Sequence, residues 1–409
     1  MARTVVVGAA LLLSACGSAG PAASPSPPAA TSAATIAATS TAGTTGTCLQ
    51  RSSPPPPAAS GPGPQVPALA TVQFVSPRQG WVAGRGRILA TTDAGTTWTA
   101  QYQGPAQITL VDFVDARTGW AVALDGLLGT TDGGGCWRRL GEPSQLLVAV
   151  HFVDPRRGWG VAGSTAVRAN GLPTTVALGD GVPVQPAGGR LVTTDDGGRS
   201  WHDVATTPPD VQSVCFSDPG HGWLGAGGQL YRSIDGGAGW QLVPGLPFPS
   251  GGSGVVSLQC AAPDSAWLLD LSLQGAAGNS PYAAFAASGG HPPVELFEDM
   301  FGGGASRPIP GSFPGPFSVL GATAAAFLGQ TGALPPNPVG FEEAAVAGTT
   351  VSITHVERVP GIDRAWGAGF TSPTTGWVVA DTGGEAGQAV ILATTDAGHT
   401  WIRQYATAR

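Results

Sequence analysis

Two eight-residue motifs recur along the chain, and a chain that repeats short patterns in this way folds into repeated structural units. The first motif begins with Phe and ends with Gly-Trp, and it occurs at 74–81, 113–120, 152–159, 216–223 and 370–377. The second motif reads Ser/Thr-x-Asp-x-Gly-x-x-Trp, and it occurs at 91–98, 130–137, 194–201, 233–240 and 394–401. A weaker copy of the first motif lies at 260–267. Of the 12 Trp, all but Trp366 occupy the last position of a motif.

The residues between the motifs predict four short strands in each unit. In the second unit, strands are expected at 108–113 and 119–123, with a third entering the second motif near Leu127 and a fourth beginning at Trp137. Pro, Asp and Gly mark the turns between them. Four strands in a unit of about 40 residues is the pattern of a β-propeller blade.

The sequence therefore predicts an all-β fold, a seven-bladed β-propeller with four antiparallel strands per blade. The last blade is expected to supply its own outer strand, so that the ring closes without a strand from the N-terminus. The predicted blades are 67–104, 105–143, 145–207, 210–247, 253–299, 314–359 and 361–409.

The aspartate of the second motif is expected to stabilise its own turn. A short carboxylate can accept hydrogen bonds from N–H groups of the same turn, and glycine permits positive φ. A structural role is therefore predicted for Asp93, Asp132, Asp196, Asp235 and Asp396.

The two motifs together resemble those of the BNR/Asp-box propellers, and among these the photosystem II stability and assembly factor type. The resemblance covers 67–409 and is strongest in the first four blades and the last. It implies a scaffold that binds other proteins and performs no catalysis. It does not imply a role in photosynthesis.

The N-terminus resembles a bacterial lipoprotein signal. A short apolar run at 5–13 is followed by Leu13-Ser14-Ala15-Cys16, which looks like a lipobox. The resemblance implies that residues 1–15 are a signal peptide and that Cys16 carries the lipid of an extracytoplasmic membrane anchor. Residues 16–66 are rich in Ala, Ser, Thr and Pro, which predicts a disordered tether in front of the propeller at 67–409.

Charge and histidine spacing argue against some classes of function but do not identify the function. The net charge of −7 gives no overall reason to bind nucleic acid. The six His show no metal-ligand spacing, so neither a metal site nor a cofactor is predicted. We expect a monomer that binds an unidentified protein partner.

The alternative function is a glycan-binding or glycoside-hydrolysing, sialidase-like propeller. A sialidase-like site needs a central Tyr, yet Tyr102, Tyr231, Tyr282 and Tyr405 are expected on outer strands. A pair of carboxylates could serve a glycosidase instead. The candidates are Asp112 on an inner strand and an acidic run in the fifth blade, Glu295, Glu298 and Asp299.

Arginines recur at one position of the turn inside the first motif. Arg78, Arg117 and Arg156 hold this position in the first three blades, with Arg157 beside Arg156 and His221 one position later in the fourth blade. Equivalent turns of neighbouring blades share one rim, so these side chains are predicted to form a basic arc that recognises carboxylates or phosphates. The alternative is that each pairs with a nearby acid: Asp115, Asp154 or Asp218.

The remaining cysteines predict two disulfides, because an exported protein permits them. Cys260 replaces the motif Phe of the fifth blade, and Cys215 precedes the Phe of the fourth. Adjacent strand residues point to opposite faces, so these two side chains can meet between neighbouring blades. Cys48 and Cys136 are then left to pair with each other and to pin the end of the tether.

Overall fold

The computed structural model describes residues 48–49, 68–141, 146–164, 187–246, 253–272, 280–301, 313–330, 339–383 and 387–407. These residues belong to one compact unit, Gly46–Arg409. The predicted signal peptide, Cys16 and nearly all of the tether lie outside the described residues. Every element in the described ranges is a β-strand. The described part of the chain holds no helix with the length and hydropathy that a membrane crossing requires.

The strands form six antiparallel sheets, and within each sheet they follow one another in chain order. The first sheet has six strands: β1 (Thr71–Phe74), β2 (Gly80–Thr91), β3 (Thr99–Phe113), β4 (Gly119–Ala123), β5 (Gly126–Thr130) and β6 (Arg138–Arg139). The other five sheets have four strands each.

The next two sheets carry the motifs of the third and fourth predicted blades. They consist of β7 (Leu147–Phe152), β8 (Gly158–Ser164), β9 (Ala187–Thr194) and β10 (His202–Asp203), and of β11 (Val211–Phe216), β12 (Gly222–Ala226), β13 (Gln229–Ser233) and β14 (Gln241–Val243).

The last three sheets follow in the same way. They consist of β15 (Ser253–Ala262), β16 (Ser265–Ser272), β17 (Ser280–Ser288) and β18 (Val294–Phe301); of β19 (Phe313–Gly321), β20 (Ala324–Gln330), β21 (Val339–Ala347) and β22 (Thr350–Val359); and of β23 (Arg364–Phe370), β24 (Gly376–Asp381), β25 (Ala389–Thr394) and β26 (Ile402–Ala406).

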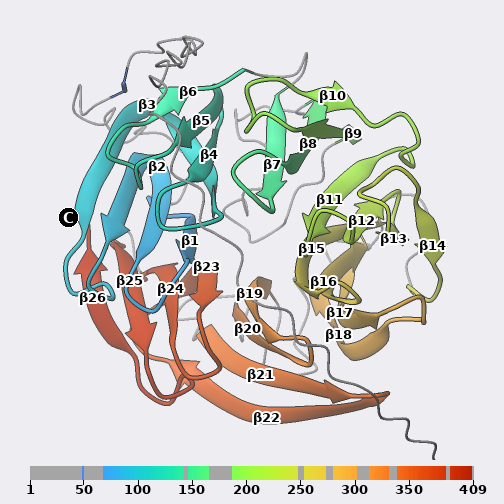
Figure 1. The fold of residues 1–409 in the computed structure, drawn as a ribbon. Helices are drawn as coiled ribbons and strands as arrows, with labels where there is room; N and C mark the ends of the chain where they lie inside the picture. The colour runs from blue at the N-terminus through green and yellow to red at the C-terminus, as the bar shows by residue number, and fades with distance from the viewer. Residues whose placement is uncertain are drawn as a thin grey trace, which may run out of the picture. The chain divides into compact units, whose positions relative to one another are not determined.

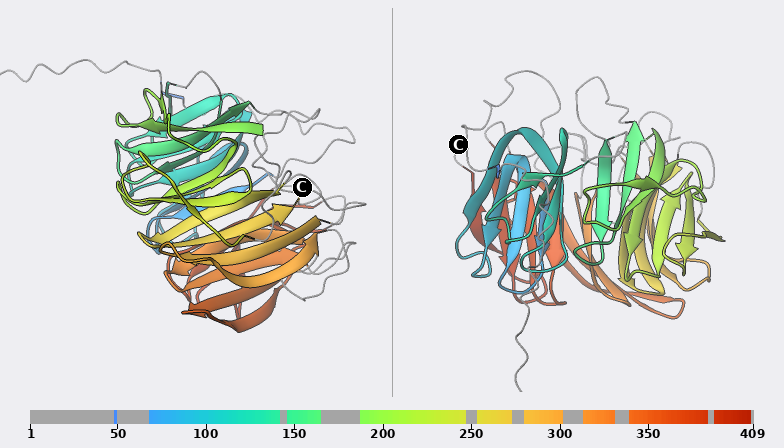
Figure 2. Two further views of the ribbon diagram at one scale, coloured as in Figure 1. Left: turned by 90° about the vertical axis from the view of Figure 1, so that its right-hand side faces the viewer. Right: turned by 45° about the horizontal axis from the view of Figure 1, so that its top comes forward.

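The sheets stand side by side around a central axis, which makes the fold a β-propeller with four antiparallel strands per blade (Figures 1 and 2). The inner strands β1, β3, β7, β11, β15, β19 and β23 contact one another in this order, and β23 contacts β1 again. They surround a channel of about 760 Å³. The β23–β26 sheet contains only C-terminal strands, which confirms that the ring closes without a strand from the N-terminus.

The prediction of seven separate blades is wrong, because the structure has six sheets and the first two predicted blades form one of them. The sequence places a boundary at Gly104-Pro105, a dipeptide typical of turns. In the structure β3 continues through this point, and it pairs with β2 as far as Gln107 and with β4 from Ile108 onward. Neither ladder pairs residues 104–106, so the missing N–H of Pro105 costs no hydrogen bond. The six-stranded sheet therefore supplies two inner strands to the ring.

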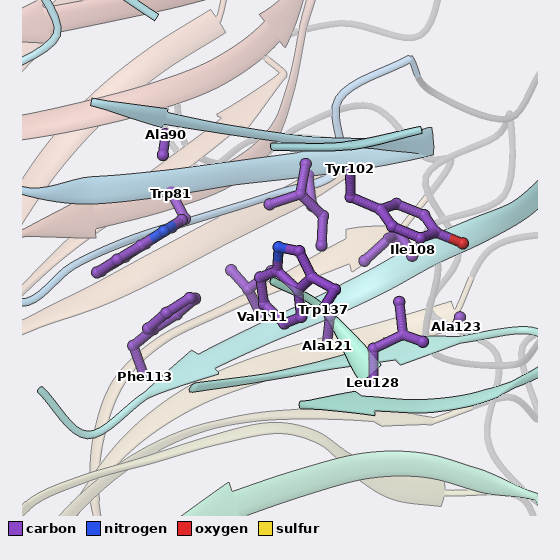
Figure 3. Packing of buried hydrophobic residues seen from close by; sticks show 12 residues of the cluster. Trp81, Ala90, Tyr102, Ile108, Val111, Phe113, Ala121, Ala123, Leu128 and Trp137 are labelled. Carbon is purple, nitrogen blue, oxygen red and sulfur yellow. The ribbon is translucent and has the colours of Figure 1, made fainter. Parts of the chain in front are cut away.

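Aromatic stacking joins neighbouring sheets. Four of the five Phe of the first motif lie flat on the motif Trp of the preceding unit, whereas Phe370 stacks on Phe341 at 5.8 Å. Phe113, for example, lies on Trp81 with ring centroids 3.5 Å apart (Figure 3). The Trp of the second motif, Trp137 in this unit, meets the same Phe edge-on at 5.8 Å. The flat pairs that repeat this contact, all at 3.4 to 3.5 Å, are Phe74 on Trp377, Phe152 on Trp120 and Phe216 on Trp159.

The glycine before each motif Trp makes room for this stack. A Cβ at Gly119 would lie 2.3 Å from the Phe113 ring, a distance that no side chain tolerates. Phe113 and Trp120 are also buried, at 4% and 2% exposure. Within one motif the Gly thus leaves space for the Phe ring, and the Trp stacks on the Phe of the next unit.

Polar side chains on the inner strands cross from one sheet to the next. Gln73 accepts from Phe113 N at 2.6 Å and donates to Phe113 O at 3.2 Å. Asp112 accepts from Phe152 N at 2.7 Å, and His151 Nε2 lies 2.6 Å from Phe216 O. These links hold the inner strands together where no backbone ladder joins them. Two others of this kind run from Gln259 to Phe317 and Val319, and from Phe370 to Ser318.

We expect Asp112→Asn to keep or raise the free energy of unfolding at neutral pH, and Asp112→Ala to lower it by about 1–3 kcal/mol. Burial raises the pKa of Asp112, while His151 and the Phe152 N–H partly oppose this. A raised folded pKa means that the carboxyl stabilises the fold when protonated and that this stability is lost as pH rises above the ordinary value of 3.8. Asparagine keeps the acceptor without the charge. Urea unfolding of both variants from about pH 4 to about pH 8 measures the difference, and equal destabilisation by both variants would contradict this account.

Candidate functional site

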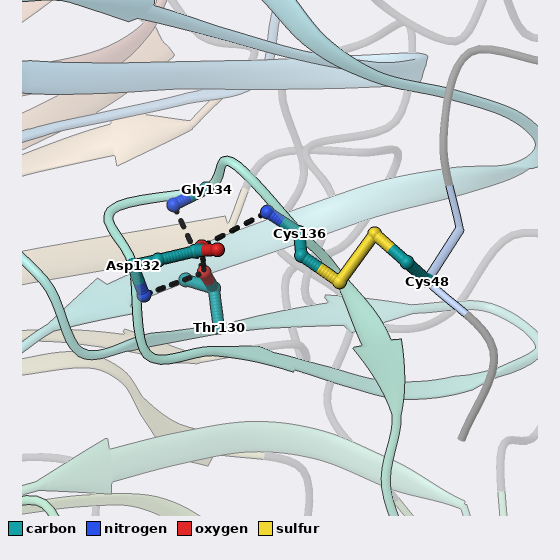
Figure 4. The surroundings of a disulfide bond; sticks show 5 residues. All are labelled: Cys48, Thr130, Asp132, Gly134 and Cys136. Atoms are coloured by element: carbon teal, nitrogen blue, oxygen red, sulfur yellow. Dashed lines mark hydrogen bonds between the residues drawn. A yellow bond between two sulfur atoms is a disulfide. The ribbon is translucent and has the colours of Figure 1, made fainter. Parts of the chain in front are cut away.

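The five aspartate turns share one hydrogen-bond pattern, shown for Asp132 in Figure 4. The Thr130 hydroxyl donates to Asp132 Oδ1 at 2.8 Å and accepts from Gly134 N at 2.9 Å. Asp132 Oδ1 also accepts from Cys136 N at 2.9 Å. Gly133 and Gly134 have φ of 73° and 92°, a region that residues with a side chain rarely adopt.

The aspartate turns of Asp132, Asp196 and Asp235 each connect two neighbours on the rim. Gly133 N donates to Arg117 O at 2.7 Å, so the turn holds the backbone of the turn inside the first motif of its own unit. Gly133 O accepts from the indole N–H of Trp81 in the preceding unit at 3.2 Å. Trp120 and Trp159 donate in the same way to Gly197 O and Gly236 O. The contacts of the five aspartates are those of turn-stabilising residues.

Hydroxyl donors lower the pKa of these carboxyls. The Thr400 hydroxyl donates to Asp396 Oδ2 at 2.6 Å and the Thr400 N–H donates to Oδ1 at 2.9 Å. Together they lower the pKa of Asp396 to about 2. The Thr97 hydroxyl likewise lowers the pKa of Asp93.

The predicted basic arc lies on the rim that carries the aspartate turns. Arg78, Arg117, Arg156 and Arg157 are all exposed. Gln79 Nε2 donates to Ala116 O at 2.8 Å, which brings the turn that holds Arg78 beside the turn that holds Arg117. The structure thus brings these two neighbouring turns of the arc together.

The acids beside the arc are committed to backbone groups rather than to the arginines. Asp115 Oδ1 accepts from Arg117 N at 2.7 Å, and Asp154 Oδ1 accepts from Arg156 N at 2.7 Å. Among the described residues, the ion pairs are Arg139–Asp125, Arg190–Asp203, His221–Asp218 and Arg232–Asp264, and none includes an arginine of the arc. The alternative of pairing with turn acids therefore holds for His221, whose Nδ1 lies 2.9 Å from Asp218 Oδ2, and not for the four arginines.

The central channel offers little for the alternative function. Of the described residues that line it, Asp112 is the one acid, and none is a Tyr or an Arg. His151, which also lines the channel, is bound to Phe216 O. A glycosidase needs two opposed carboxyls, and the described channel wall provides one.

The other residues weighed for catalysis lie away from the channel. Tyr102 and Tyr405 lie on β3 and β26 in outer-strand positions, and Tyr231 and Tyr282 lie on β13 and β17. Glu295, Glu298 and Asp299 lie on β18, the last strand of its sheet, where both glutamates are exposed. Within the described ranges, no group of three or more His, Cys, Asp or Glu is placed to hold a metal ion.

The structure brings both cysteine pairs together. Cys215 and Cys260 form a disulfide with Cα atoms 5.6 Å apart, and it joins β11 to β15. Cys48 and Cys136 form a second with Cα atoms 5.4 Å apart (Figure 4). Leu49 N also donates to Trp137 O at 2.8 Å. This end of the tether is therefore held beside the aspartate turn that contains Asp132.

Sequence reasoning missed the polar links between inner strands. A signal was present, because a residue able to make such a link precedes the motif Phe, or its replacement Cys260, in five units. These residues are Gln73, Asp112, His151, Cys215 and Gln259.

A comparison with protein-family models finds no match for the chain. No curated protein matches it. Among solved structures, U3-55K aligns with a TM-score of 0.52 and 8% identity over 78% of this chain and 91% of that chain. The WD40 repeats of RRP9 align with a TM-score of 0.52 and 8% identity over 78% of this chain and 90% of that chain. An ancestral GH74 enzyme aligns with a TM-score of 0.51 and 14% identity over 89% of this chain and 48% of that chain.

This chain thus spans about half the length of that GH74 enzyme. At such low identities the similarity establishes the β-propeller fold alone.

We expect Asp396→Ala to lower the thermal midpoint at neutral pH, with a difference from the unmodified chain that shrinks as pH falls from about 4 to about 2. The folded pKa of Asp396 lies below its ordinary value, so its contribution is present above 3.8 and lost as pH falls toward 2. Asp396→Asn keeps one hydrogen-bond acceptor, so its thermal midpoint should lie between those of the unmodified chain and Asp396→Ala. Thermal unfolding across this pH range measures the effect, and a difference that does not depend on pH would argue against the assigned role of the carboxylate.

Proposed function

We propose that this protein is a lipid-anchored extracytoplasmic β-propeller that binds a protein partner through its arginine rim and performs no catalysis. The rim is defined by Arg78, Arg117, Arg156 and Arg157. A role as a scaffold or assembly factor at the membrane agrees with these features.

One observation carries the proposal: the acids next to the arc arginines accept hydrogen bonds from turn N–H groups. The carboxylates of these acids bind backbone groups of their own turns. The guanidinium groups of Arg78, Arg117 and Arg157 have no intramolecular partner among the described residues. A planar guanidinium matches a carboxylate or phosphate with two parallel hydrogen bonds. The aspartate turns hold the backbone that carries these arginines, so the groups are presented on a fixed frame.

The motifs support the same reading through their resemblance to the BNR/Asp-box propellers of the photosystem II assembly factor type. That resemblance implies a protein-binding scaffold. The geometry of the turns around Asp93, Asp132 and Asp396 agrees with it, because each aspartate is used to build a turn.

The glycan-directed alternative has less support. The likeness to an ancestral GH74 enzyme concerns the fold alone, and Asp112 is used to link two sheets. Hydrolysis of an oligosaccharide library by the purified chain would restore this alternative.

Changing Arg78, Arg117 and Arg156 to Glu together should abolish capture of a stoichiometric partner from native membranes. The reason is that three guanidiniums become carboxylates on exposed turns, which reverses their attraction for anionic groups. Affinity capture followed by mass spectrometry measures the loss.

The matched control changes Arg138, Arg358 and Arg403 to Glu, which makes the same change in net charge on exposed positions of β6, β22 and β26. This control should still capture the partner, and both triple variants should keep thermal midpoints close to that of the unmodified chain. Capture that survives in the rim variant would remove the arginines from the binding surface.

The proposed anchor predicts that the mature protein begins at Cys16 and carries acyl chains there. Mass spectrometry of the N-terminal peptide from native membranes should show Cys16 as the first residue with the mass of its lipid. An unmodified Cys16, or a mature N-terminus at another residue, would contradict the anchor.

A further inference from the structure

The β11–β14 sheet differs from the other sheets in exposing an apolar side chain in its aspartate turn. Ile234 is 58% exposed and occupies the position between Ser and Asp in its aspartate turn. The same position in the other turns holds a polar residue: Thr92, Thr131, Asp195 or Thr395. An exposed apolar side chain in one copy alone has no role in the shared architecture of the turns.

A cleft of about 290 Å³ lies beside Ile234, between the β7–β10 and β11–β14 sheets. Its lining includes Arg157, Trp159 and His202 from one sheet, and Pro219 and Asp235 from the other. Ile234 is not itself a lining residue, but it directly precedes Asp235, which is one.

The equivalent space between the first two units is bridged by side chains. Gln79 reaches Ala116 O at 2.8 Å, and Gln101 donates to Gly133 O at 2.8 Å. Counted from the motif Trp, Arg157 takes the place of Gln79, and Val204 takes the place of Gln101. Val204 cannot donate to a carbonyl, and within the described ranges no hydrogen bond or ion pair involves the Arg157 guanidinium. Trp159 Nε1 donates to Gly236 O at 3.2 Å and Thr206 Oγ1 donates to Ala238 O at 2.7 Å across this gap, while Arg157 and Val204 add no bridge to it.

We propose that this cleft receives an acidic side chain of a protein partner, while Ile234 contacts an apolar side chain next to it. The assignment rests on the proposed function and names the part of the rim that selects the partner. Arg157 supplies two parallel N–H donors for a carboxylate, and His202 supplies an imidazole on the same wall of the cleft. An uncommitted arginine next to an exposed apolar residue is the composition typical of residues that dominate binding at protein interfaces.

The acids in the cleft wall do not fill this role themselves. The Asp235 carboxylate is held in its turn by Ser233 Oγ at 2.8 Å and Gly239 N at 2.9 Å. Asp195 also lines the cleft, and its backbone carbonyl accepts from Arg156 Nε at 3.2 Å. The Arg156 guanidinium is thus bound to the backbone of Asp195, and no ion pair joins the two side chains among the described residues.

The test uses the full purified chain and an array of short labelled peptides in which Glu stands next to Leu in varied flanking sequences. Matched peptides carry Gln in place of Glu. We expect a subset of Glu–Leu peptides to bind with saturation, and their Gln counterparts to bind at least about tenfold more weakly, because the charge-assisted hydrogen bonds are lost. Fluorescence anisotropy measures both affinities.

Variants of the chain locate the binding. Arg157→Gln should weaken the selected peptide by about 10- to 100-fold, and Ile234→Thr, which restores the residue type of the other turns, by about 3- to 10-fold. The matched controls are Arg403→Gln and Ile402→Asn, both at exposed positions of β26 in another sheet, and they should leave the affinity unchanged.

Several results would overturn the assignment. These are equal binding of Glu and Gln peptides, binding that Arg157→Gln does not change, binding only to vesicles of phosphatidylglycerol, or self-association of the chain that Ile234→Thr abolishes. Capture from native membranes separates this failure from that of the proposed function. If the Arg157→Gln/Ile234→Thr chain keeps a partner that the triple Glu variant loses, the proposed function stands and the cleft is not the selecting site.

Discussion

The flat stacking of a phenylalanine on the tryptophan of the preceding unit is the contact on which the ring depends. Among the described residues no backbone ladder runs from one sheet to the next, so side chains must hold each sheet against its neighbour. The ring of each such phenylalanine also leaves no room for a side chain at the glycine of its own motif, as Phe113 does at Gly119, which explains the glycine of the Gly-Trp pair. The indole N–H is then satisfied by a carbonyl of the next aspartate turn, such as Gly133 O. Because the aspartate fixes that carbonyl, the two motifs depend on each other across the interface between units.

The interface between β11–β14 and β15–β18 shows what happens where a motif is lost. Cys260 stands in place of the phenylalanine, so Trp223 has no ring to stack on, and the β15–β18 sheet has no aspartate turn. Among the described residues the Trp223 indole N–H accordingly has no acceptor, although the residue is fully buried. A buried unpaired donor costs about 1–3 kcal/mol. The disulfide between Cys215 and Cys260 joins these same two sheets, and closing a long loop in this way contributes about 2–4 kcal/mol. A covalent link thus offsets the loss of the aromatic contact.

Much of the fold could be predicted because the repeats report on contacts inside one unit. Strands such as β4, at Gly119–Ala123, lie where the motif spacing puts them. The sheet count could not be predicted, because Gly104-Pro105 has the composition of a turn and yet lies in a continuous strand whose partners change between Gln107 and Ile108. The candidate site was harder to predict from the sequence than the fold. Arg157 could be placed on the rim from its motif position, but the cleft beside it depends on which side chains fill the gap between two sheets. Val204 adds no bridge across that gap where another unit has Gln101, a difference that matters only once the sheets are packed.

The repeated units also separate architecture from function, because each unit serves as a reference for the others. A residue that keeps its type in every copy, such as the aspartate of the turn, is explained by the contacts it makes in every copy. Some residues differ from their equivalents in the other units without improving any contact within the ring. For such a residue we look for a role in binding another molecule. Cys215 departs and repairs an interface, so the ring explains it. Ile234 departs and exposes apolar surface, and Arg157 occupies a position that holds no constant residue type and makes no bridge like that of Gln79. Arg157 lines a cleft on the rim whose backbone the aspartate turns hold in place, and Ile234 directly precedes another lining residue, Asp235. A rigid frame that presents two such side chains loses little entropy on binding.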